Sequence, residues 1–490
     1  MIVASFLYFS LFFHPTYLCF NLLLNLALIG CYSSANIWYQ SLGSTKADLV
    51  QESDLTKAKT WPTSVKMKTM FLLFGLWDLV ENGYEEQESV NDMMLAQQKE
   101  LNDKKQDDNA ALGMIQRGVA DSIFPRIMEA TKAKEAWEIL MQKFQGDVKP
   151  TLYVKRQGNV DILIISLYVD DLVFTRNNEK MIQVFKQEMM MNYEISDMGL
   201  LHQFLGIEIC QDEDGVFISQ RKYVVEILKK FGMASCKPIA SPLVVNEKLM
   251  KEDGAKKVDA TSYRSLVRNL LYLTTTRPDI MFAASFLFKF IKNNSHIQLG
   301  AAKRVLRYLQ DTICYGIKFR KDSKLKFVGY YDSDWGGCID DMKSTSGYAF
   351  LLGSCVFSWA SKKQQSVAQS SAKVEYISAS LATSQAIWLR RIMKDIGLKQ
   401  KKSTTIYCDN RLAIAIAKNP VHYGRTRHIA IKHHFIRQAI EKGEVELKFC
   451  RSEEQVANFF TKALRRMKFQ QFREALEVVE QHIKAENVVN

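Results

Sequence analysis

The chain has 490 residues, enough for about three domains, and its 47% hydrophobic and 24% charged residues are ordinary for folded globular protein, which excludes a largely disordered chain. Its 66 Lys and Arg against 53 Asp and Glu leave a net charge of +13, which favours a polyanionic partner such as nucleic acid; a basic surface that only serves solubility is the alternative. Nine cysteines without a CxxC pair argue against a zinc ribbon or a disulfide framework and indicate free thiols.

The first segment, residues 1–45, contains no charged side chain and is almost wholly apolar up to residue 31. One interpretation is a membrane-inserted or signal-like leader. Against it, Pro15 divides the run, no basic region precedes it, and each half is shorter than a span of about 20 residues. The other interpretation is upstream non-coding sequence translated into the start of the chain.

Residues 46–148 are predicted to be helical. Ala133, Trp137, Leu140 and Phe144 recur at helical spacing and define one apolar stripe, and residues 64–80 show a similar pattern. The polar stretch at residues 97–109 indicates a solvated helix or a loop. None of these residues forms a catalytic pattern, so the prediction is a small helical domain for packing or assembly.

A change of period at residue 151 predicts a β-hairpin. Two apolar strands, at residues 162–167 and 172–174, flank Asp170 and Asp171 and would place both carboxylates at the hairpin tip. A helix at 181–191, strands at 204–209 and 215–219, and helices at 226–231, 259–277 and 280–290 are expected to follow.

From residue 324 onward strands and helices alternate. The predicted strands are 326–331, 348–352, 356–359, 404–408 and 445–449, and the predicted helices include one with the stripe Val374, Ile377, Leu381 and Trp388. This order predicts a mixed sheet flanked by helices.

Three acids in this last unit occur at the ends of predicted core elements. Asp332 follows the first strand, Asp409 follows the fourth, and Glu375 borders the apolar stripe of the long helix. Each alone is ordinary at a solvated strand end. Converging at one sheet edge, the three would offer the oxygen ligands that Mg²⁺ requires, and two such ions can hydrolyse a phosphodiester.

Several short motifs in this unit resemble the RNase H domain of Copia-type LTR retrotransposons. They are YDSDW at 331–335, KSTSGY at 343–348, SWASKKQ at 358–364, EY at 375–376, CDN at 408–410 and RTRHI at 425–429. The resemblance implies an RNase H fold that cuts the RNA strand of an RNA·DNA hybrid with Mg²⁺ or Mn²⁺. It assigns Asp332, Glu375 and Asp409 as metal-binding catalytic carboxylates, with the neighbouring acid Asp334 as an alternative ligand.

The same resemblance exposes a departure at the fourth acidic position. The segment VANFFTK at 456–462 carries Asn458 where the family pattern has an aspartate. An amide brings no negative charge, so binding of a second ion should weaken. We therefore expect a folded domain whose nuclease activity is weak or lost.

Basic residues of this unit are the expected contacts to the nucleic-acid backbone, with a solvated basic face as the alternative. They are Lys362, Lys363, Arg425, Arg427 and His428.

Tyr168-Val169-Asp170-Asp171 and later motifs such as TRPD at 276–279 resemble the Copia-type reverse transcriptase from its catalytic hairpin through the thumb and connection. Asp170 and Asp171 are then remnants of its catalytic carboxylates. Polymerisation requires a further aspartate and the fingers, which no upstream segment supplies. Reverse transcriptase activity is therefore predicted to be absent.

WDLVENGY at 77–84 and AKEAWEIL at 133–140 resemble the Gag segment of plant Copia elements. The expected protein is a Gag–Pol fragment of mixed class, α+β or α/β and multidomain, joined near residues 146–150. Its layout is an apolar leader (1–45), a Gag-like helical domain (46–148), a partial palm and thumb (149–245), a connection (246–320), an RNase H-like domain (321–475) and a tail (476–490).

Three hypotheses follow for function. The first is a degenerate Pol product that binds, and weakly cleaves, RNA·DNA hybrids. The second is a non-catalytic nucleic-acid-binding or assembly protein that self-associates through residues 46–148. The third is a membrane-tethered product, if residues 1–31 insert. The first two predict a cytoplasmic or nuclear location and the third a membrane location.

Overall fold

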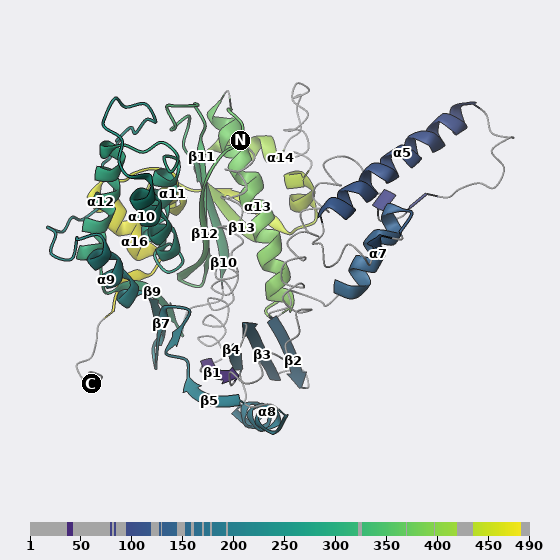
Figure 1. The fold of residues 1–490 in the computed structure, drawn as a ribbon, viewed down its shortest axis with the longest axis horizontal. Helices are drawn as coiled ribbons and strands as arrows, with labels where there is room; N and C mark the ends of the chain where they lie inside the picture. Colours follow the sequence, from purple (N-terminus) through teal and green to yellow (C-terminus); the bar gives the residue numbers. More distant parts are fainter. Residues whose placement is uncertain are drawn as a thin grey trace.

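The computed structural model describes residues 37–42, 79–80, 83–84, 95–118, 127–128, 130–144, 152–157, 161–168, 171–176, 179–192, 195–321, 326–368, 370–395, 397–418 and 435–481. Within them the chain has a mixed α/β architecture with three five-stranded sheets (Figure 1). Most of the apolar leader and of the predicted helix at 64–80 lies outside these ranges.

The helical unit near the N-terminus consists of α5 (Leu95–Gly118) and α7 (Ala133–Phe144). The predicted stripe of α7 is partly confirmed, because Ala133 and Trp137 are buried. The polar stretch at 97–109 forms part of α5, so it is a solvated helix rather than a loop. Asp108 is its buried exception, and its carboxylate accepts the N–H of Ala133 at the start of α7. A small core of its own joins the two helices.

The first sheet, here called the hairpin sheet, has the strand order β2–β3–β4–β1–β5. Its members are β2 (Leu152–Gln157), β3 (Asp161–Tyr168), β4 (Asp171–Arg176), β1 (Ile37–Leu42) and β5 (Ile195–Leu200). The predicted hairpin is present as the antiparallel pair β3–β4. Strand β1, which comes from the predicted leader, lies between β4 and β5 and pairs antiparallel with both. Helix α8 (Glu179–Asn192) packs on this sheet through a small core that includes Phe174 and Phe185.

The second sheet, here called the connection sheet, has the order β15–β9–β8–β7–β6. Its strands are β6 (Gln203–Phe204), β7 (Ile207–Asp212), β8 (Gly215–Ser219), β9 (Tyr315–Arg320) and β15 (Val478–Glu480). Strand β15 falls in the predicted tail, yet it pairs antiparallel with β9, which precedes the predicted RNase H-like domain.

Helices between β8 and β9 form the connection bundle. They are α9 (Arg221–Lys230), α10 (Ala260–Leu273), η3 (Pro278–Ile280), α11 (Met281–Phe288) and α12 (His296–Asp311). The sequence predicts helices at 226–231, 259–277 and 280–290, but it does not predict the last one, at 296–311. Two helices of the bundle start with side-chain caps: Asp259 accepts two backbone N–H groups of α10, and Ser295 forms a capping box on α12.

The third sheet, here called the C-terminal sheet, has the order β12–β11–β10–β13–β14. Its strands are β10 (Phe327–Ser333), β11 (Thr345–Leu352), β12 (Cys355–Lys363), β13 (Thr404–Cys408) and β14 (Val445–Phe449), each overlapping a predicted strand. The first three pair antiparallel, whereas β10–β13 and β13–β14 are parallel. The predicted mixed sheet is therefore present.

Helices flank the C-terminal sheet as the sequence predicts (Figure 1). They include α13 (Ser371–Asp395), α14 (Arg411–Lys418) and the short helix η4 (Val456–Phe460), whereas α16 (Arg466–Ala475) lies beside α10 and α12 of the connection bundle.

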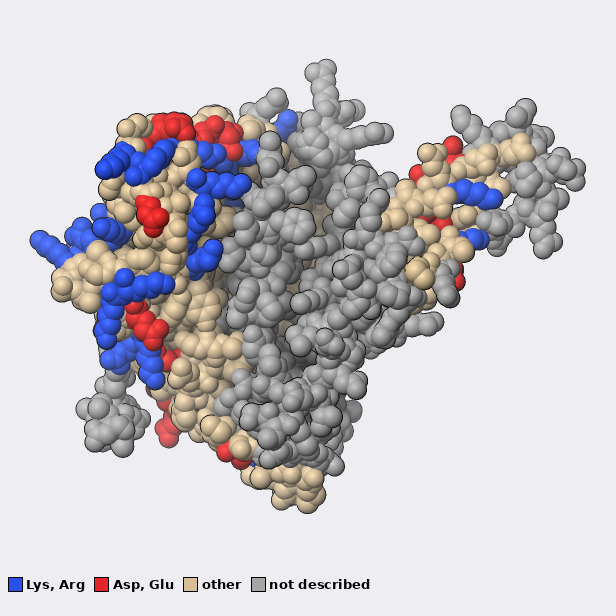
Figure 2. Space-filling view, in the orientation of Figure 1, with Lys and Arg blue, Asp and Glu red and all other residues tan. Residues whose placement is uncertain are grey.

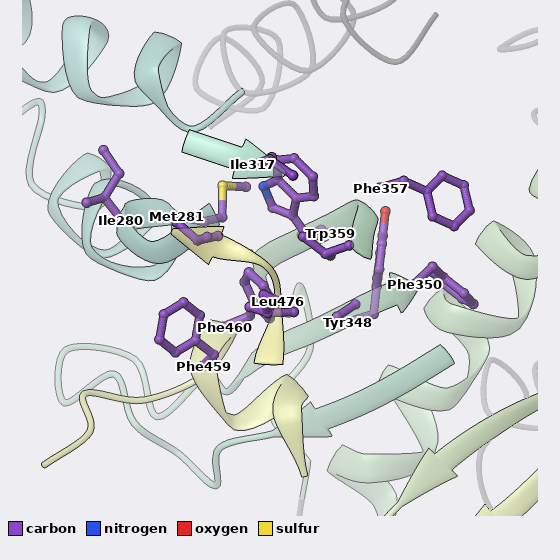
Figure 3. Packing of buried hydrophobic residues seen from close by; sticks show 14 of the residues in the cluster. Ile280, Met281, Ile317, Tyr348, Phe350, Phe357, Trp359, Phe459, Phe460 and Leu476 are labelled. Atoms are coloured by element: carbon purple, nitrogen blue, oxygen red, sulfur yellow. The ribbon is translucent and has the colours of Figure 1, made fainter. Parts of the chain in front are cut away.

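One hydrophobic core joins the connection bundle to the C-terminal sheet. Figure 3 shows Ile280 and Met281 of the bundle near Trp359 of β12, with Phe460 and Leu476 from the end of the chain packed beside them. The Trp359 indole donates to the Thr274 carbonyl at 3.2 Å. Because this core is shared, the predicted connection and RNase H-like domain are not separable packing units.

Candidate metal centre

The three predicted acids converge at one edge of the C-terminal sheet. Asp332 lies near the end of β10, and Asp409 directly follows β13. Since β10 and β13 are adjacent and parallel, their carboxyl ends meet at the same edge. One ligand oxygen of each acid, with Glu375 as the third, falls within 4.8 Å of the others. This is the only group of three or more potential metal-ligating acids, histidines or cysteines found in the described part of the chain.

Helix α13 brings Glu375 to the cluster because it packs on the sheet through a face of small residues. Ser378, Ala382 and Ala386 are buried at helical spacing on the same side as Glu375. These small side chains allow the helix to approach the sheet closely, and the Ser378 hydroxyl donates to the Asp332 carbonyl at 2.8 Å. Of the predicted stripe only Val374 is buried; Ile377, Leu381 and Trp388 are half-buried, because the small residues form the inner face instead.

Burial sets the electrostatics of the cluster. Asp332 is 2% exposed and Glu375 is 6% exposed. Burial is the largest cause that raises the pKa of Asp332, and it raises the pKa of Glu375 well above its ordinary value, with the neighbouring carboxylates adding to the rise. A cation bound among the acids would favour their charged forms, because opposite charge offsets both burial and mutual repulsion.

Two oxygens near the cluster lack a partner. Ser333 N–H donates to Glu375 Oε1 at 3.2 Å, while Glu375 Oε2 is buried with no hydrogen-bond partner. Asn458, 3% exposed on η4, donates its amide to the Ser452 carbonyl at 3.2 Å, and its Oδ1 is also unpaired. The Ser452 hydroxyl in turn donates to Asp409 at 2.8 Å. Unsatisfied buried oxygens beside a carboxylate group fit a bound cation, whose ligands they would be.

Gly347 lets η4 approach this edge. It lies directly opposite Asp332 in the β10–β11 pair. A Cβ placed there would lie 2.7 Å from Phe460 Cβ and 2.8 Å from Thr461 Cγ2, which no real side chain tolerates without a shift. The glycine therefore admits the turn that carries Asn458, Thr461 and Lys462.

Asp334, the neighbouring acid, serves the loop rather than the cluster. Its carboxylate accepts the backbone N–H of Thr345, and Gly337 packs closely against it. Burial raises its pKa to about 6.

Of the predicted nucleic-acid contacts, only Lys362 and Lys363 lie in the described part of the chain. Burial lowers the pKa of Lys362, and Lys363 forms an ion pair with Asp341 at 2.8 Å, so neither is a fully solvated cation. Arg425, Arg427 and His428 lie outside the described residues.

The predicted remnant of a polymerase site lies only partly within the described residues. Asp171 begins β4 opposite Tyr168, and Asp170 lies outside the described residues.

Three features of this part of the molecule went unpredicted from the sequence. Lys462 Nζ lies 3.5 Å from Asp332 Oδ2, and the Thr461 hydroxyl donates to the same oxygen. Both residues belong to the VANFFTK segment, in which the family pattern predicts a role only for position 458. Gly347 likewise stood in a motif without an assigned role.

Much of the chain's positive charge lies in the connection bundle. Residues 221–311 hold seventeen Lys and Arg against seven Asp and Glu, a surplus of ten in a chain with a net charge of +13. Figure 2 shows Lys and Arg gathered on the side of the molecule where α9 and α12 lie. In the described part of the chain, no helix combines the length and apolarity needed to cross a bilayer.

Family models match two segments of the chain. Residues 130–245 match the model described as reverse transcriptase (RNA-dependent DNA polymerase), and residues 67–155 match the gag-polypeptide of LTR copia-type. The matches overlap at 130–155, which contains the join predicted near 146–150.

Two solved structures show weak likeness. One is an N-terminal RNase H domain from Mycobacterium tuberculosis, with 10% identity, TM-score 0.21, and 31% of this chain and 99% of that chain covered. The other is a foamy viral protease–reverse transcriptase in complex with dsDNA, with 14% identity, TM-score 0.18, and 60% and 56% covered. These scores are too low to establish a shared fold.

Several curated relatives are transposon proteins. The retrovirus-related Pol polyprotein from transposon RE1 of Arabidopsis thaliana is 31% identical over 472 residues, which cover 91% of this chain and 31% of that protein. The one from transposon RE2 is 34% identical over 355 residues, with 71% and 24% covered. A putative transposon Ty5-1 protein of Saccharomyces cerevisiae is 34% identical over 221 residues, with 44% and 72% covered. The chain spans about a third or less of the two Arabidopsis polyproteins, and it belongs to the family of Copia-type retrotransposon Pol polyproteins.

Proposed function

We propose that this chain binds RNA·DNA hybrids and that its C-terminal unit cleaves the RNA strand weakly, with Mg²⁺ or Mn²⁺. The observation that carries the proposal is the convergence of Asp332, Glu375 and Asp409 within 4.8 Å at the edge of a mixed sheet. The surplus of Lys and Arg in the connection bundle, which shares a core with that sheet, supports a polyanionic substrate such as a hybrid.

Asp332, Glu375 and Asp409 would hold the cation, and the unpaired Oδ1 of Asn458 is suited to a further, neutral ligand. A bound divalent cation would lower the pKa of a bound water and stabilise the negative charge on the leaving oxygen. The residues fix this site: Ser333 orients one oxygen of Glu375, and Ser452 orients Asp409. Because the acids are fixed at this edge of the sheet, the scissile phosphate would be held in one orientation relative to them.

Weak activity follows from the charge at position 458. An aspartate there would add a fourth negative charge, whereas the amide of Asn458 adds none. Each ~1.4 kcal/mol of lost transition-state stabilisation slows the reaction about tenfold. Asn458→Asp keeps the volume of the buried side chain but removes the amide that donates to the Ser452 carbonyl.

The decisive experiment is cleavage of a 5′-labelled RNA·DNA hybrid by the full chain, beside Asp332→Asn and Asn458→Asp. The full chain is required because the C-terminal sheet shares its core with the connection bundle. We expect slow cleavage that Asp332→Asn abolishes and Asn458→Asp accelerates about 10- to 1000-fold, the range for ~1.4–4 kcal/mol. Cleavage that survives Asp332→Asn would refute the assigned site.

We also propose that the chain does not polymerise DNA. The strand beside β4 is β1, whose sequence IWYQSL contains no carboxylate. Strand β2, which pairs with β3 on the other side of the hairpin, has the sequence LYVKRQ, so neither strand neighbouring the Asp170–Asp171 hairpin brings a third metal-binding aspartate. Primer extension on an RNA template should give no product, and any product lost in Asp171→Asn would overturn this proposal.

A further inference from the structure

Lys462 reaches the carboxylate cluster from the turn after η4. Its Nζ lies 3.5 Å from Asp332 Oδ2. The preceding residue, Thr461, donates its hydroxyl to the same oxygen. Two consecutive residues thus place a positive charge and a hydrogen-bond donor on one carboxylate oxygen of the proposed ion site.

The backbone holds this lysine in place while its side chain keeps access to solvent. The N–H groups of Thr461 and Lys462 both donate to the Asn458 carbonyl at 3.3 Å. The Lys462 side chain is 46% exposed, whereas that of Asp332 is 3% exposed. The ammonium group therefore stands at the mouth of the cluster, with the buried acid behind it.

Charge counting indicates how many ions such a site suits. Three carboxylates carry at most three negative charges, and Asn458 adds none. With Lys462 the sum becomes minus two, the charge that one divalent ion neutralises. A second divalent ion would bring surplus positive charge into a largely buried site, which is costly.

We propose that Lys462 is a resident cation of this cluster, which limits it to one divalent ion and weakens the binding of that ion. This inference rests on the proposed function, because it presupposes that the cluster binds metal. Lys462 acts here as a positioning residue through Asp332.

The test is a Mn²⁺ titration of the full chain, with free Mn²⁺ followed by electron paramagnetic resonance. Ions bound elsewhere are subtracted with Asp332→Asn. We expect one Asp332-dependent ion in the unaltered chain. Lys462→Gln should bind it about tenfold more tightly, which corresponds to ~1.4 kcal/mol. Lys462→Gln combined with Asn458→Asp should bind two ions, whereas Lys462→Arg should retain the original affinity.

Lys134→Gln is the matched control. Lys134 forms an ion pair with Glu138 at 3.9 Å and is 39% exposed, but it lies on α7. Its removal changes the net charge equally and should leave Mn²⁺ binding unchanged.

The outcomes separate the two proposals. Two Asp332-dependent ions in the unaltered chain, or an unchanged affinity in Lys462→Gln, would overturn the role of Lys462 and leave the metal site standing. Equal Mn²⁺ binding by the unaltered chain and Asp332→Asn would instead remove the metal site itself, and with it this inference.

Discussion

Substitutions in the buried ion pair of the TRPD motif should be among the most destabilising in the fold. Arg277 is 1% exposed and Asp279 is 0% exposed at their side chains, and Arg277 donates to Asp279 at 2.9 and 2.7 Å. The guanidinium also donates to the Thr312 carbonyl at 2.8 Å, and the Tyr308 hydroxyl donates to Asp279 at 2.7 Å. Burial alone would raise the pKa of Asp279, but Arg277 and Tyr308 outweigh it and hold that pKa below its ordinary value.

Asp279→Ala should therefore cost much more than the loss of a surface ion pair. It leaves the Arg277 charge buried with only neutral acceptors, and removing one partner of a buried pair typically costs ~3–5 kcal/mol. Hydrogen exchange of peptides from α10, α11 and α12 measures the opening free energy locally. At ~1.4 kcal/mol per decade, exchange of the slowest amides should accelerate by about two to four decades.

The matched control is Glu441→Ala. Glu441 pairs with Arg437 at 2.7 Å, the same distance as in the buried pair, but both side chains are about half exposed. Its loss should cost under ~1 kcal/mol. Acceleration of less than tenfold in Asp279→Ala, or an equal effect in Glu441→Ala, would refute the argument that burial decides the cost.

Three further perturbations test other contacts. Gly347→Ala should destabilise by ~1–3 kcal/mol through its clash with Phe460, and calorimetry showing an unchanged melting temperature would contradict the close packing of η4. Asp341→Asn should destabilise by at most ~1 kcal/mol at neutral pH, since solvent screens the partly exposed pair with Lys363, whose side chains are 33% and 22% exposed. The pKa of Asp341 is lowered from 3.8 to about 2, so this stability is present above pH 3.8 and lost as pH falls through 2; urea unfolding should show the difference from the unaltered chain vanish there. Tyr39→Pro removes a β1 N–H and should expose β4, so light scattering should detect aggregation that Tyr39→Val does not cause.

The C-terminal sheet could be predicted from sequence because its strands and turns are local signals. Each of its five strands overlaps a predicted run, and Asp332 and Asp409 lie at strand ends as expected. The convergence with Glu375 followed from element order alone. The sequence could not predict which face of α13 packs on the sheet, because the small residues that permit close packing carry no hydrophobic signal.

Other features depend on partners distant in sequence. Strand β1 comes from a segment whose apolar composition suggested a leader, and its pairing with β4 spans more than a hundred residues. Lys462 is a charged residue that sequence analysis assigns to solvent, and only the fold brings it to Asp332. Arg277 and Asp279 stand two residues apart, but their burial depends on Tyr308 and Thr312 of α12 and its end.

Strand β15 ties the order of synthesis to the order of folding. It closes the connection sheet on β9, and Arg320 at the end of β9 contacts Glu477, 157 positions later. Domains tend to fold as they leave the ribosome, earlier segments first. The edge of the connection sheet at β9 therefore stays unpaired until the whole C-terminal sheet has been translated. A chain whose translation ends before residue 478 would leave that edge unprotected.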